Sequence, residues 1–291
     1  MDAPVAQLMV GGVTAGCAYA LLAVAYSLVY RTSRAINFAQ GNLAMLGAYV
    51  AFAGPPLLTE HRVLGIAAGL FTVAVLSVAI DRTAFRPLYK HGTVFIVASS
   101  IALVFVVETI VRLVWGSQTI SAAPLIDGTT DFGTLYVSNQ RLLIAVVLVV
   151  TLLGLQLLFR SRTGIAIRTS AENPEAARLL GISPAWMITL SFALAGLVSA
   201  AAGILLAPLT QLTPGSGAII GLTAVTAAIV GGFGSIPGAV LGGIFIGLVE
   251  VWTTYLAGSS YALIATFSVL IVVLLVRPSG LLGEEGLSDR R

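Results

Sequence analysis

The stretch from Arg160 to Pro184 reads RSRTGIAIRTSAENPEAARLLGISP, and it is a long polar segment in the middle of an otherwise apolar chain. Within it, Asn173 is a preferred N-cap residue, Pro174 suits the first helical position, and Gly181 favours a C-terminal stop. The segment therefore predicts a short helix from Pro174 to Leu180. At about 1.5 Å of rise per residue this helix spans roughly 10 Å, too little to cross a membrane or to be stable alone in water. Such a short helix needs to pack against another part of the protein or against a partner protein.

The composition around this segment is that of an integral membrane protein. Of 291 residues, 58% are hydrophobic and 9% are charged, whereas about a quarter of an ordinary soluble domain is charged. A bilayer solvates apolar side chains directly, but a soluble globule needs a charged exterior. The net charge of +3 comes with no basic tract, so we expect no nucleic-acid partner. Cys17 is the single cysteine, which excludes an intrachain disulfide.

The apolar runs predict an all-α, polytopic helical bundle of about eight or nine transmembrane helices, forming a single transmembrane domain over residues 1–291. A span needs about 20 mostly apolar residues. The candidates are residues 5–30, 38–58, 63–81, 93–115, 142–159, 185–207, 217–233, 238–257 and 260–276. The run at 217–233 is short enough to be either a span or a re-entrant segment, which is why the count stays at eight or nine.

Orientation follows from the Lys and Arg residues in the loops. Twelve of the 15 fall on one side if every span crosses: Arg31, Arg34, Arg82, Arg86, Lys90, Arg160, Arg162, Arg168, Arg178, Arg277, Arg290 and Arg291. This side is predicted to be the cytoplasm, with the N-terminus outside and the C-terminus inside. The start, MDAPVAQLMVGG, lacks the positive region of a signal peptide and is predicted to be an uncleaved first helix. Residues 116–141 form an extracytoplasmic loop, expected to be a small lid or a short hairpin.

The residue inventory argues against an enzyme. The two histidines, His61 and His91, are predicted on opposite membrane surfaces, so no His-based metal site or catalytic dyad is expected. Lys90 is the only lysine, and no glycine-rich phosphate loop ends at it. We therefore expect no cofactor on this chain, and any ATP must bind to another chain.

A glycine cluster, GGFGSIPGAVLGG, lies between Gly231 and Gly243. Such residues allow helices to approach closely, and they also allow a helix to break or bend. Both interpretations are open; the density of the cluster favours a bend or gate beside a conduit. The candidate residues for that role are Gly231, Gly232, Gly234, Pro237 and Gly238.

Charged residues inside apolar runs need partners, because an ionised side chain at mid-bilayer costs about 2.5–3.5 kcal/mol on insertion scales. Glu108 and Arg112 are four residues apart and are predicted to pair on one helix face. Glu250 has no local partner in the sequence, so it either lines a pathway or makes an interhelical hydrogen bond.

Three amides, Asn37, Gln40 and Asn42, recur where the second span begins. They are compatible with capping that helix near the cytoplasmic surface. Their clustering around Gly41 is equally compatible with a polar lining of a substrate pathway.

Three segments of the sequence resemble those of a known family. Glu175-Ala176-Ala177, followed by Gly181, is similar to the EAA loop with which permeases of ATP-binding cassette (ABC) importers dock on their ATPase. INFAQGNLAMLGAY (Ile36 to Tyr49) and GLTAVTAAIVGGFGSIPGAVLGG (Gly221 to Gly243) resemble segments of branched-chain amino acid permeases of the LivH type. One departure is SFAL at Ser191 to Leu194, where the general EAA pattern has Ile-x-Leu-Pro.

The resemblance implies an ABC importer permease fold in the bacterial inner membrane. The implied partners are a second, homologous permease chain forming a heterodimer, two ATPase subunits that bind ATP and Mg²⁺, a periplasmic substrate-binding protein and membrane lipid. Residues 160–184 would be the cytoplasmic EAA-like coupling loop. Its coupling residues would be Asn173, Pro174, Glu175, Ala176, Ala177, Arg178, Leu179, Leu180 and Gly181.

In this scheme the helix at Pro174 to Leu180 receives motion from the ATPase and passes it through Pro184 to the sixth span. Ala177, Leu179 and Leu180 would fill an apolar groove on the ATPase, with polar contacts at the rim. The predicted function is import of branched-chain amino acids by alternating access. Import of urea, short amides or another amino-acid-like solute is an alternative, and a passive channel or secondary transporter is an alternative of a different class.

Overall fold

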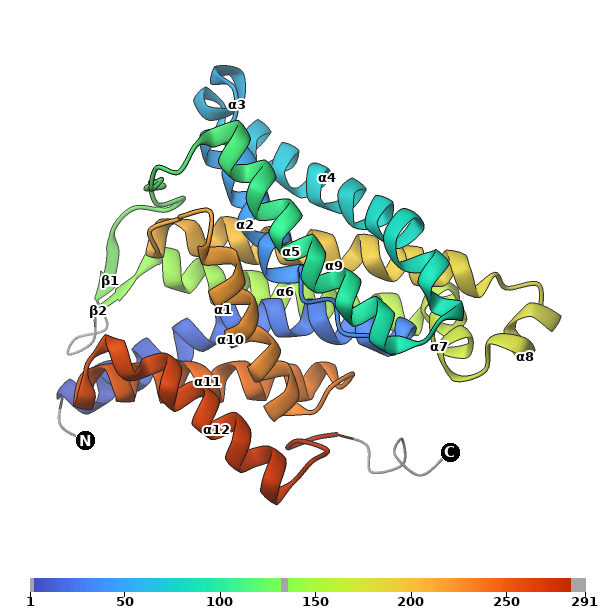
Figure 1. The fold of residues 1–291 in the computed structure, drawn as a ribbon. Helices are drawn as coiled ribbons and strands as arrows, with labels where there is room; N and C mark the ends of the chain where they lie inside the picture. Colours follow the sequence, from blue (N-terminus) through green and yellow to red (C-terminus); the bar gives the residue numbers. More distant parts are fainter. Residues whose placement is uncertain (1–2, 132–135, 284–291) are drawn as a thin grey trace.

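The computed structural model describes residues 3–131 and 136–283, and this part of the chain is a bundle of helices (Figure 1). The longer elements are α1 (Ala3–Ser33), α2 (Gln40–Ala53), α4 (Arg62–Ile80), α5 (Thr93–Trp115), α6 (Asn139–Arg160), α7 (Arg162–Glu172), α9 (Pro184–Leu206), α10 (Ser216–Gly231), α11 (Ile236–Ala257) and α12 (Ala262–Val276). The short elements are α3 (Pro56–Glu60), α8 (Pro174–Leu179), the π-helical turn η1 (Asp81–Phe85), the 3₁₀ turns η2 (Arg86–Lys90), η3 (Ala207–Leu209) and η4 (Ser259–Tyr261), and the strands β1 (Thr129–Asp131) and β2 (Tyr136–Ser138).

Seven of the helical segments in the described residues are long and apolar enough to cross a membrane. They are Val5–Ser33, Arg62–Lys90, Thr93–Trp115, Asn139–Arg160, Pro184–Leu209, Ile236–Ala257 and Ser259–Val276. The helices α2 and α10 lie among them and are shorter, with 14 and 16 residues. The chain is therefore a multi-pass membrane protein, in agreement with the predicted all-α bundle of about eight or nine helices.

The predicted span at 38–58 is shorter in the structure, where α2 ends at Ala53. Pro55 follows, and because a proline disfavours helical geometry in the residue before it, the helix stops there. With 14 residues α2 is about 21 Å long, less than the roughly 30 Å of bilayer hydrocarbon. Most of its side chains are buried, so its neighbours cover it rather than lipid.

The segment predicted as either a span or a re-entrant loop is one continuous helix, α10. Just before it, Leu212 exchanges two backbone hydrogen bonds with Ile120 of the loop after α5, at 2.9 and 3.1 Å. At its other end, the backbone N–H groups of Leu281 and Leu282 donate to the carbonyls of Val230 and Gly231. The helix therefore connects the loop region after α5 to the segment that follows α12.

The core is organised around α1, which packs against α9, α10 and α11. Its residues from Ala18 to Ala25 are all buried apart from Tyr19, which is partly buried. Where α1 crosses α11, a Cβ atom on Gly16 would lie 2.5 Å from the Cα of Ile244. Glycine is therefore required there, and the backbones meet as they do in small-residue contacts between membrane helices.

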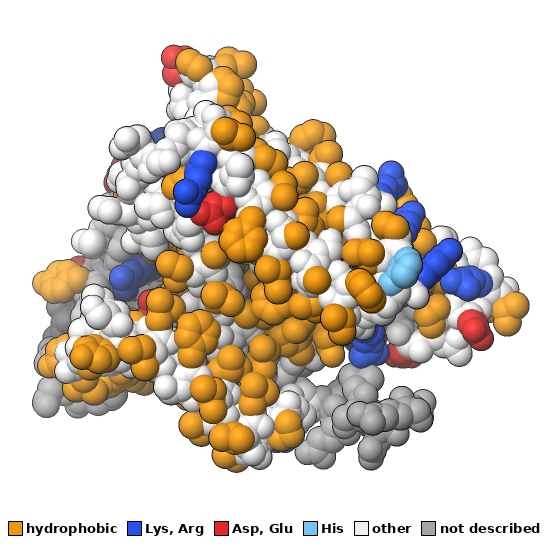
Figure 2. Space-filling view, viewed as in Figure 1, with side chains coloured by type: hydrophobic (Ala, Val, Ile, Leu, Met, Phe, Trp, Pro, Cys, Tyr) orange, Lys and Arg blue, Asp and Glu red, His pale blue; other side chains and the backbone are white. Residues whose placement is uncertain are grey.

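Large apolar side chains cover much of the face of the bundle that Figure 2 shows. Phe71 of α4, Phe105 of α5 and Leu275 of α12 are among the exposed ones. Glu108 and Arg112 on α5 form the predicted ion pair, with Arg112 Nη2 2.5 Å from Glu108 Oε1. Several Lys and Arg side chains gather toward the end of the molecule that carries α7 and α8 (Figure 2).

The opposite end carries the hairpin of β1 and β2, which is the short hairpin expected within the 116–141 loop (Figure 1). Gln7 near the start of α1 holds this hairpin, because its side chain donates to the Tyr136 carbonyl at 2.6 Å and accepts from the Tyr136 N–H at 3.2 Å. The hairpin and α8 therefore lie at opposite ends of the bundle.

Candidate functional site

The short helix α8 begins as the sequence predicts. The Asn173 side chain accepts hydrogen bonds from the backbone N–H groups of Glu175 and Ala176, at 3.1 and 3.0 Å. Pro174 stands in the first turn, where a missing N–H costs nothing, and Glu175 lies at the positive end of the helix dipole. The predicted N-terminus is thus confirmed.

The helix ends in a Schellman motif, the pattern of two hydrogen bonds that closes many helices. The Gly181 N–H donates to the Arg178 carbonyl at 3.0 Å, and the Ile182 N–H donates to the Ala177 carbonyl at 2.9 Å. Gly181 has a φ of 77°, the left-handed conformation in which a side chain is strained. The predicted stop at Gly181 is confirmed, with the last helical residue at Leu179.

Two leucines at the end of α8 are almost uncovered by the rest of the chain. Leu179 is 90% exposed and Leu180 is 71% exposed. Ala177, which the sequence also predicts to contact a partner, has an exposed fraction of 0%, so its side chain already packs within the chain. Leu179 and Leu180 are therefore the apolar side chains of α8 that remain available to another protein.

The structure adds a helix that the sequence reasoning missed, α7, directly before α8. Ser161 caps it by accepting a hydrogen bond from the Gly164 N–H at 3.3 Å, and this serine is the local signal that could have revealed it. The two helices α7 and α8 project from one end of the bundle (Figure 1). The segment from Arg160 to Pro184 thus contains two successive helices joined at Asn173.

The predicted pathway amides are all buried in the bundle. Asn37 donates to the Gln40 side chain at 3.1 Å, and Gln40 donates to the Ala195 carbonyl and to Ser199 Oγ on α9. The Asn42 amide nitrogen donates to the Val104 carbonyl of α5 at 3.0 Å, while its oxygen has no partner. In this conformation the amides join helices, and their predicted role in a pathway stays a prediction.

Glu250 lies on α11 and is partly buried. Its Oε2 atom is buried without a hydrogen-bond partner, and Tyr19 of α1 lies near its carboxyl group. An interhelical hydrogen bond to Glu250 therefore stays one of the two interpretations. A place for Glu250 on a substrate pathway stays a prediction.

The glycine cluster forms the turn from α10 to α11. Its five predicted gate residues are Gly231, Gly232, Gly234, Pro237 and Gly238. Gly232 and Gly234 have φ values of 107° and 85°, and Ser235 caps α11 by accepting from the Gly238 N–H at 3.1 Å. The bend therefore lies between two helices rather than within one, and a gating role stays a prediction.

A cleft of about 1030 Å³ opens beside this turn. Its lining includes Gly234 and Pro237, together with apolar residues of α6 and α11. Four arginines also line it: Arg31, Arg34, Arg160 and Arg168. The cleft borders α7, so it opens on the side of the bundle from which α7 and α8 project.

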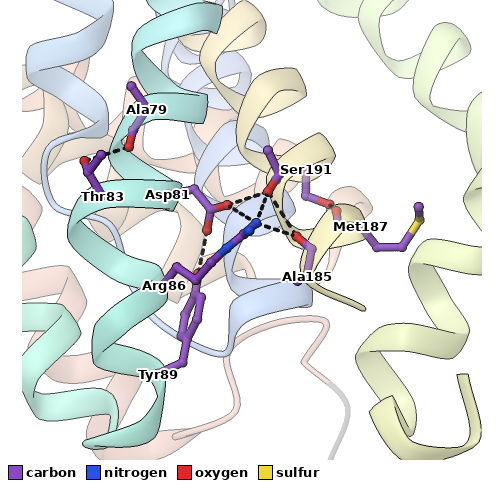
Figure 3. Close-up of polar contacts among 9 residues, drawn as sticks. Ala79, Asp81, Thr83, Arg86, Tyr89, Ala185, Met187 and Ser191 are labelled. Atoms are coloured by element: carbon purple, nitrogen blue, oxygen red, sulfur yellow. Dashed lines mark hydrogen bonds and ion pairs between the residues drawn. The ribbon is translucent and has the colours of Figure 1, made fainter. Parts of the chain in front are cut away.

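A polar cluster with a buried carboxylate, which we call the α4–α9 clamp, was not predicted from the sequence. It consists of Asp81, Arg86 and Thr189. Figure 3 labels Asp81 and Arg86 together with Tyr89 and Ala185, which contact them. The Thr189 hydroxyl donates to Asp81 Oδ2 at 2.6 Å, and Arg86 Nη2 donates to Thr189 Oγ1 at 2.6 Å and to the Ala185 carbonyl at 3.1 Å. Arg86 also pairs with Asp81 at 3.4 Å, and Tyr89 donates to the other carboxylate oxygen at 3.1 Å.

The apolar spans define a multi-pass membrane protein, and α8 adds a capped helix whose two leucines the rest of the chain leaves uncovered. The profile of the family described as "Branched-chain amino acid transport system / permease component" matches residues 8–276, and the chain belongs to this family.

Several named proteins are similar to the chain over most of its length. The chain is 35% identical over 293 residues to the high-affinity branched-chain amino acid transport system permease protein BraD of Pseudomonas aeruginosa, covering 96% of this chain and 95% of that one. It is 34% identical to LivH of Escherichia coli K12 with the same coverage, and 31% identical to a probable LivH of Methanocaldococcus jannaschii, covering 91% and 88%. Among solved structures, PsaBC from Streptococcus pneumoniae in complex with Fab matches with 13% identity and a TM-score of 0.47, covering 96% of this chain and 93% of that one.

Proposed function

We propose that the chain is the permease subunit of an ABC importer and that α8 is the helix through which a separate ATPase drives it. The observation that carries this proposal is the pair Leu179 and Leu180, 90% and 71% exposed on a helix that is capped at both ends. Exposed leucines on a rigid, polar-flanked helix are typical of a surface that another protein covers. Glu175 and Arg178 flank them and supply the polar rim of such an interface.

The chain's own residues account for how α8 would transmit force. Its two caps hold the six residues as one rigid piece, and only Leu180 to Ser183 separate it from α9. Pro184 starts α9 with a fixed backbone angle, so a displacement of α8 is not absorbed by a flexible linker. Closure of an ATPase dimer that binds ATP and Mg²⁺ would push α8, and α9 would move with it.

The proposal includes the other subunits of the importer and the orientation of the chain in the membrane. A second permease chain, homologous to this one, would pair with it, and a periplasmic binding protein would deliver the solute at the hairpin end. The end with α7 and α8 would face the cytoplasm of a bacterial inner membrane, because 12 of the 15 Lys and Arg residues are assigned to that side. The N-terminus would then be outside and the C-terminus inside.

The solutes that best fit are branched-chain amino acids, as in the names of the relatives from P. aeruginosa and E. coli. The test is reconstitution of the chain with its natural partner permease, ATPases and binding protein in vesicles. Leucine, isoleucine and valine should accumulate only when ATP is present on the side of the vesicle membrane that carries the ATPases. Urea should not accumulate under the same conditions. If urea or short amides accumulate instead, the proposed substrate is wrong, whereas the proposed ATP-driven mechanism stands.

A passive channel or secondary transporter would behave differently in the same vesicles. Solute flux would then persist without ATP and without the ATPase subunits. That result would overturn the proposal, since a chain that transports alone has no use for α8 as a docking helix.

A further inference from the structure

We infer that the α4–α9 clamp, formed by Asp81, Arg86 and Thr189, is the joint that carries movement of α8 into the membrane bundle. This inference rests on the proposed function, in which α8 is the helix that the ATPase moves. The three side chains are positioning residues, because they act through the helices that they join rather than on the transported solute.

The position of the clamp along the chain is the first argument. Thr189 and the Ala185 carbonyl lie in the first two turns of α9, which follow α8 almost directly. Asp81 begins η1, which continues α4, and Arg86 begins η2; both α4 and η1 contact α9. The clamp therefore sits where the motion of α8 first meets another membrane helix.

The burial of the clamp is the second argument. The Asp81 side chain is 0% exposed, and removing water from a carboxylate costs several kcal/mol unless partners replace it. Here three side chains from two helices replace that water: Thr189, Arg86 and Tyr89. A displacement of α9 relative to α4 would separate Thr189 from Asp81 and leave the buried carboxylate without one of its donors. Because that state is unfavourable, we expect the two helices to move together.

The π-helical turn η1 makes the clamp possible. The Arg86 N–H donates to the Asp81 carbonyl, an i to i+5 bond, and this widened turn brings the two side chains to the same face. In a regular α-helix with 3.6 residues per turn, residues five apart point in different directions. Figure 3 shows Asp81 and Arg86 directed toward one another beside Ala185 of α9.

Two further contacts strengthen the same joint. The Arg82 guanidinium lies over the Trp186 ring, 5.8 Å from its centroid, and the rings of Phe85 and Phe192 pack edge to face at 5.5 Å. Each of them links η1 to α9, and the ring face of Trp186 attracts the Arg82 cation. The joint is thus polar at its centre and aromatic at its sides.

The helix α4, which would receive the motion through the clamp, packs against buried parts of the bundle. Farther along, a Cβ atom on Gly196 of α9 would lie 2.9 Å from the Cβ of Ser77, so α4 and α9 stay in close contact beyond the clamp. The helix α4 also packs along α2, whose side chains are mostly buried. A movement that enters through the clamp therefore reaches α2 without crossing a loop.

The test compares Thr189→Val with Thr189→Ser in the complete transporter in vesicles, measuring solute taken up per ATP hydrolysed. Hydrolysis by vesicles that hold the ATPases without the permease is subtracted, so that the ratio reports on the assembled transporter. Valine has the shape of threonine without the hydroxyl, and it should lower the ratio by about fivefold or more, the range of ordinary coupling free energies. Serine keeps the hydroxyl and should restore the ratio to near the parental value.

Two controls match the change in type and place. Thr83→Val removes a hydroxyl in η1 that donates to the Ala79 carbonyl of its own helix, and Ser191→Ala removes one in α9 that donates to the Met187 carbonyl (Figure 3). Neither hydroxyl joins α4 to α9, so both variants should keep the parental ratio. Arg86→Lys provides a second variant of the clamp at a side chain that is 41% exposed; lysine keeps the charge but loses the planar fork, and the ratio should fall.

The outcomes separate this inference from the proposed function. A parental ratio in both Thr189→Val and Arg86→Lys would overturn the joint and leave the importer intact. An equal fall in Thr189→Val, Thr83→Val and Ser191→Ala would also overturn it, because loss of any helix hydroxyl would then suffice. Transport by the parental protein without ATPase subunits would instead overturn the proposed function.

Discussion

The Gln40 side chain of α2 donates a hydrogen bond of 2.6 Å to Ser199 Oγ of α9, and both residues are buried. The same amide nitrogen donates to the Ala195 carbonyl at 3.0 Å. One side chain thereby ties two helices whose sequences are far apart. A role in holding the bundle together follows directly from this geometry.

Replacing Gln40 with leucine should therefore destabilise the protein. The change removes both interhelical bonds and leaves the Ser199 hydroxyl and a backbone carbonyl without that donor, at a cost of about 1–3 kcal/mol. The midpoint of thermal unfolding in detergent should fall by several degrees. Gln156→Leu is the control, because Gln156 is exposed on α6, and it should unfold at the parental temperature. Equal midpoints for the two variants would contradict the structural role.

Replacing Leu179 and Leu180 together with serine should weaken binding of the ATPase. Central apolar anchors of interfaces often cost about 2 kcal/mol or more when truncated, so the apparent affinity should fall at least about tenfold. Co-purification with the tagged ATPase, or its titration onto the permease, measures this. Leu57→Ser changes a leucine that is 64% exposed at α3, outside the segment from Arg160 to Pro184, and it should bind as the parent does. Undiminished binding by the double variant would remove α8 from the interface.

Gly181→Val should uncouple transport while leaving the bundle folded. A β-branched residue is strained at a φ of 77°, by about 1–2 kcal/mol, so the end of α8 and its lead into α9 should shift. ATP hydrolysis should continue with several-fold less uptake. Gly181→Asn should have a milder effect, because asparagine tolerates this conformation. Gly154→Val on α6, where a Cβ meets no atom within 4 Å, is the matched control and should transport normally.

Thiol labelling should distinguish the cleft from the buried amides. In a Cys17→Ser background, cysteines at Arg34 and Gln156, which line the cleft, should react with a water-soluble reagent applied from the side of α7 and α8. A cysteine at Asn42, whose exposed fraction is 0%, should stay protected. Labelling of Asn42→Cys during ATP turnover would place that position on the transport pathway after all. Labelling of the cleft positions from the opposite side alone would reverse the proposed orientation.

The features that were predictable are local ones. Asn173, Pro174 and Gly181 define α8 through bonds within a few residues, so their types alone indicated the helix and its limits. The Glu108 and Arg112 pair was predictable for the same reason, since four residues separate neighbours on a helix face. The apolar runs likewise revealed most of the spans, because span length is set by the bilayer.

The features that were missed depend on distant parts of the chain. Asp81 reads as an ordinary charge at the end of a span until α9 brings Thr189 beside it, and nothing in the sequence near Asp81 specifies that contact. The widened turn η1, which aims Arg86 at Asp81, has no recognised sequence signal. Gln40 looked like a cap or a pathway residue because Ser199, its partner, lies far along the chain.

The hydrogen bonds from Leu281 and Leu282 to the end of α10 also set an order of events during synthesis. Val230 and Gly231 are synthesised before Leu281 and Leu282, whose N–H groups follow the whole of α11 and α12. Until then the two carbonyls lack these donors. Since a buried carbonyl without a donor is costly, the last turn of α10 completes late, and α12 must be in place before it does. A truncation that removes Leu281 and Leu282 should therefore loosen a helix far upstream, and an affinity tag belongs after them.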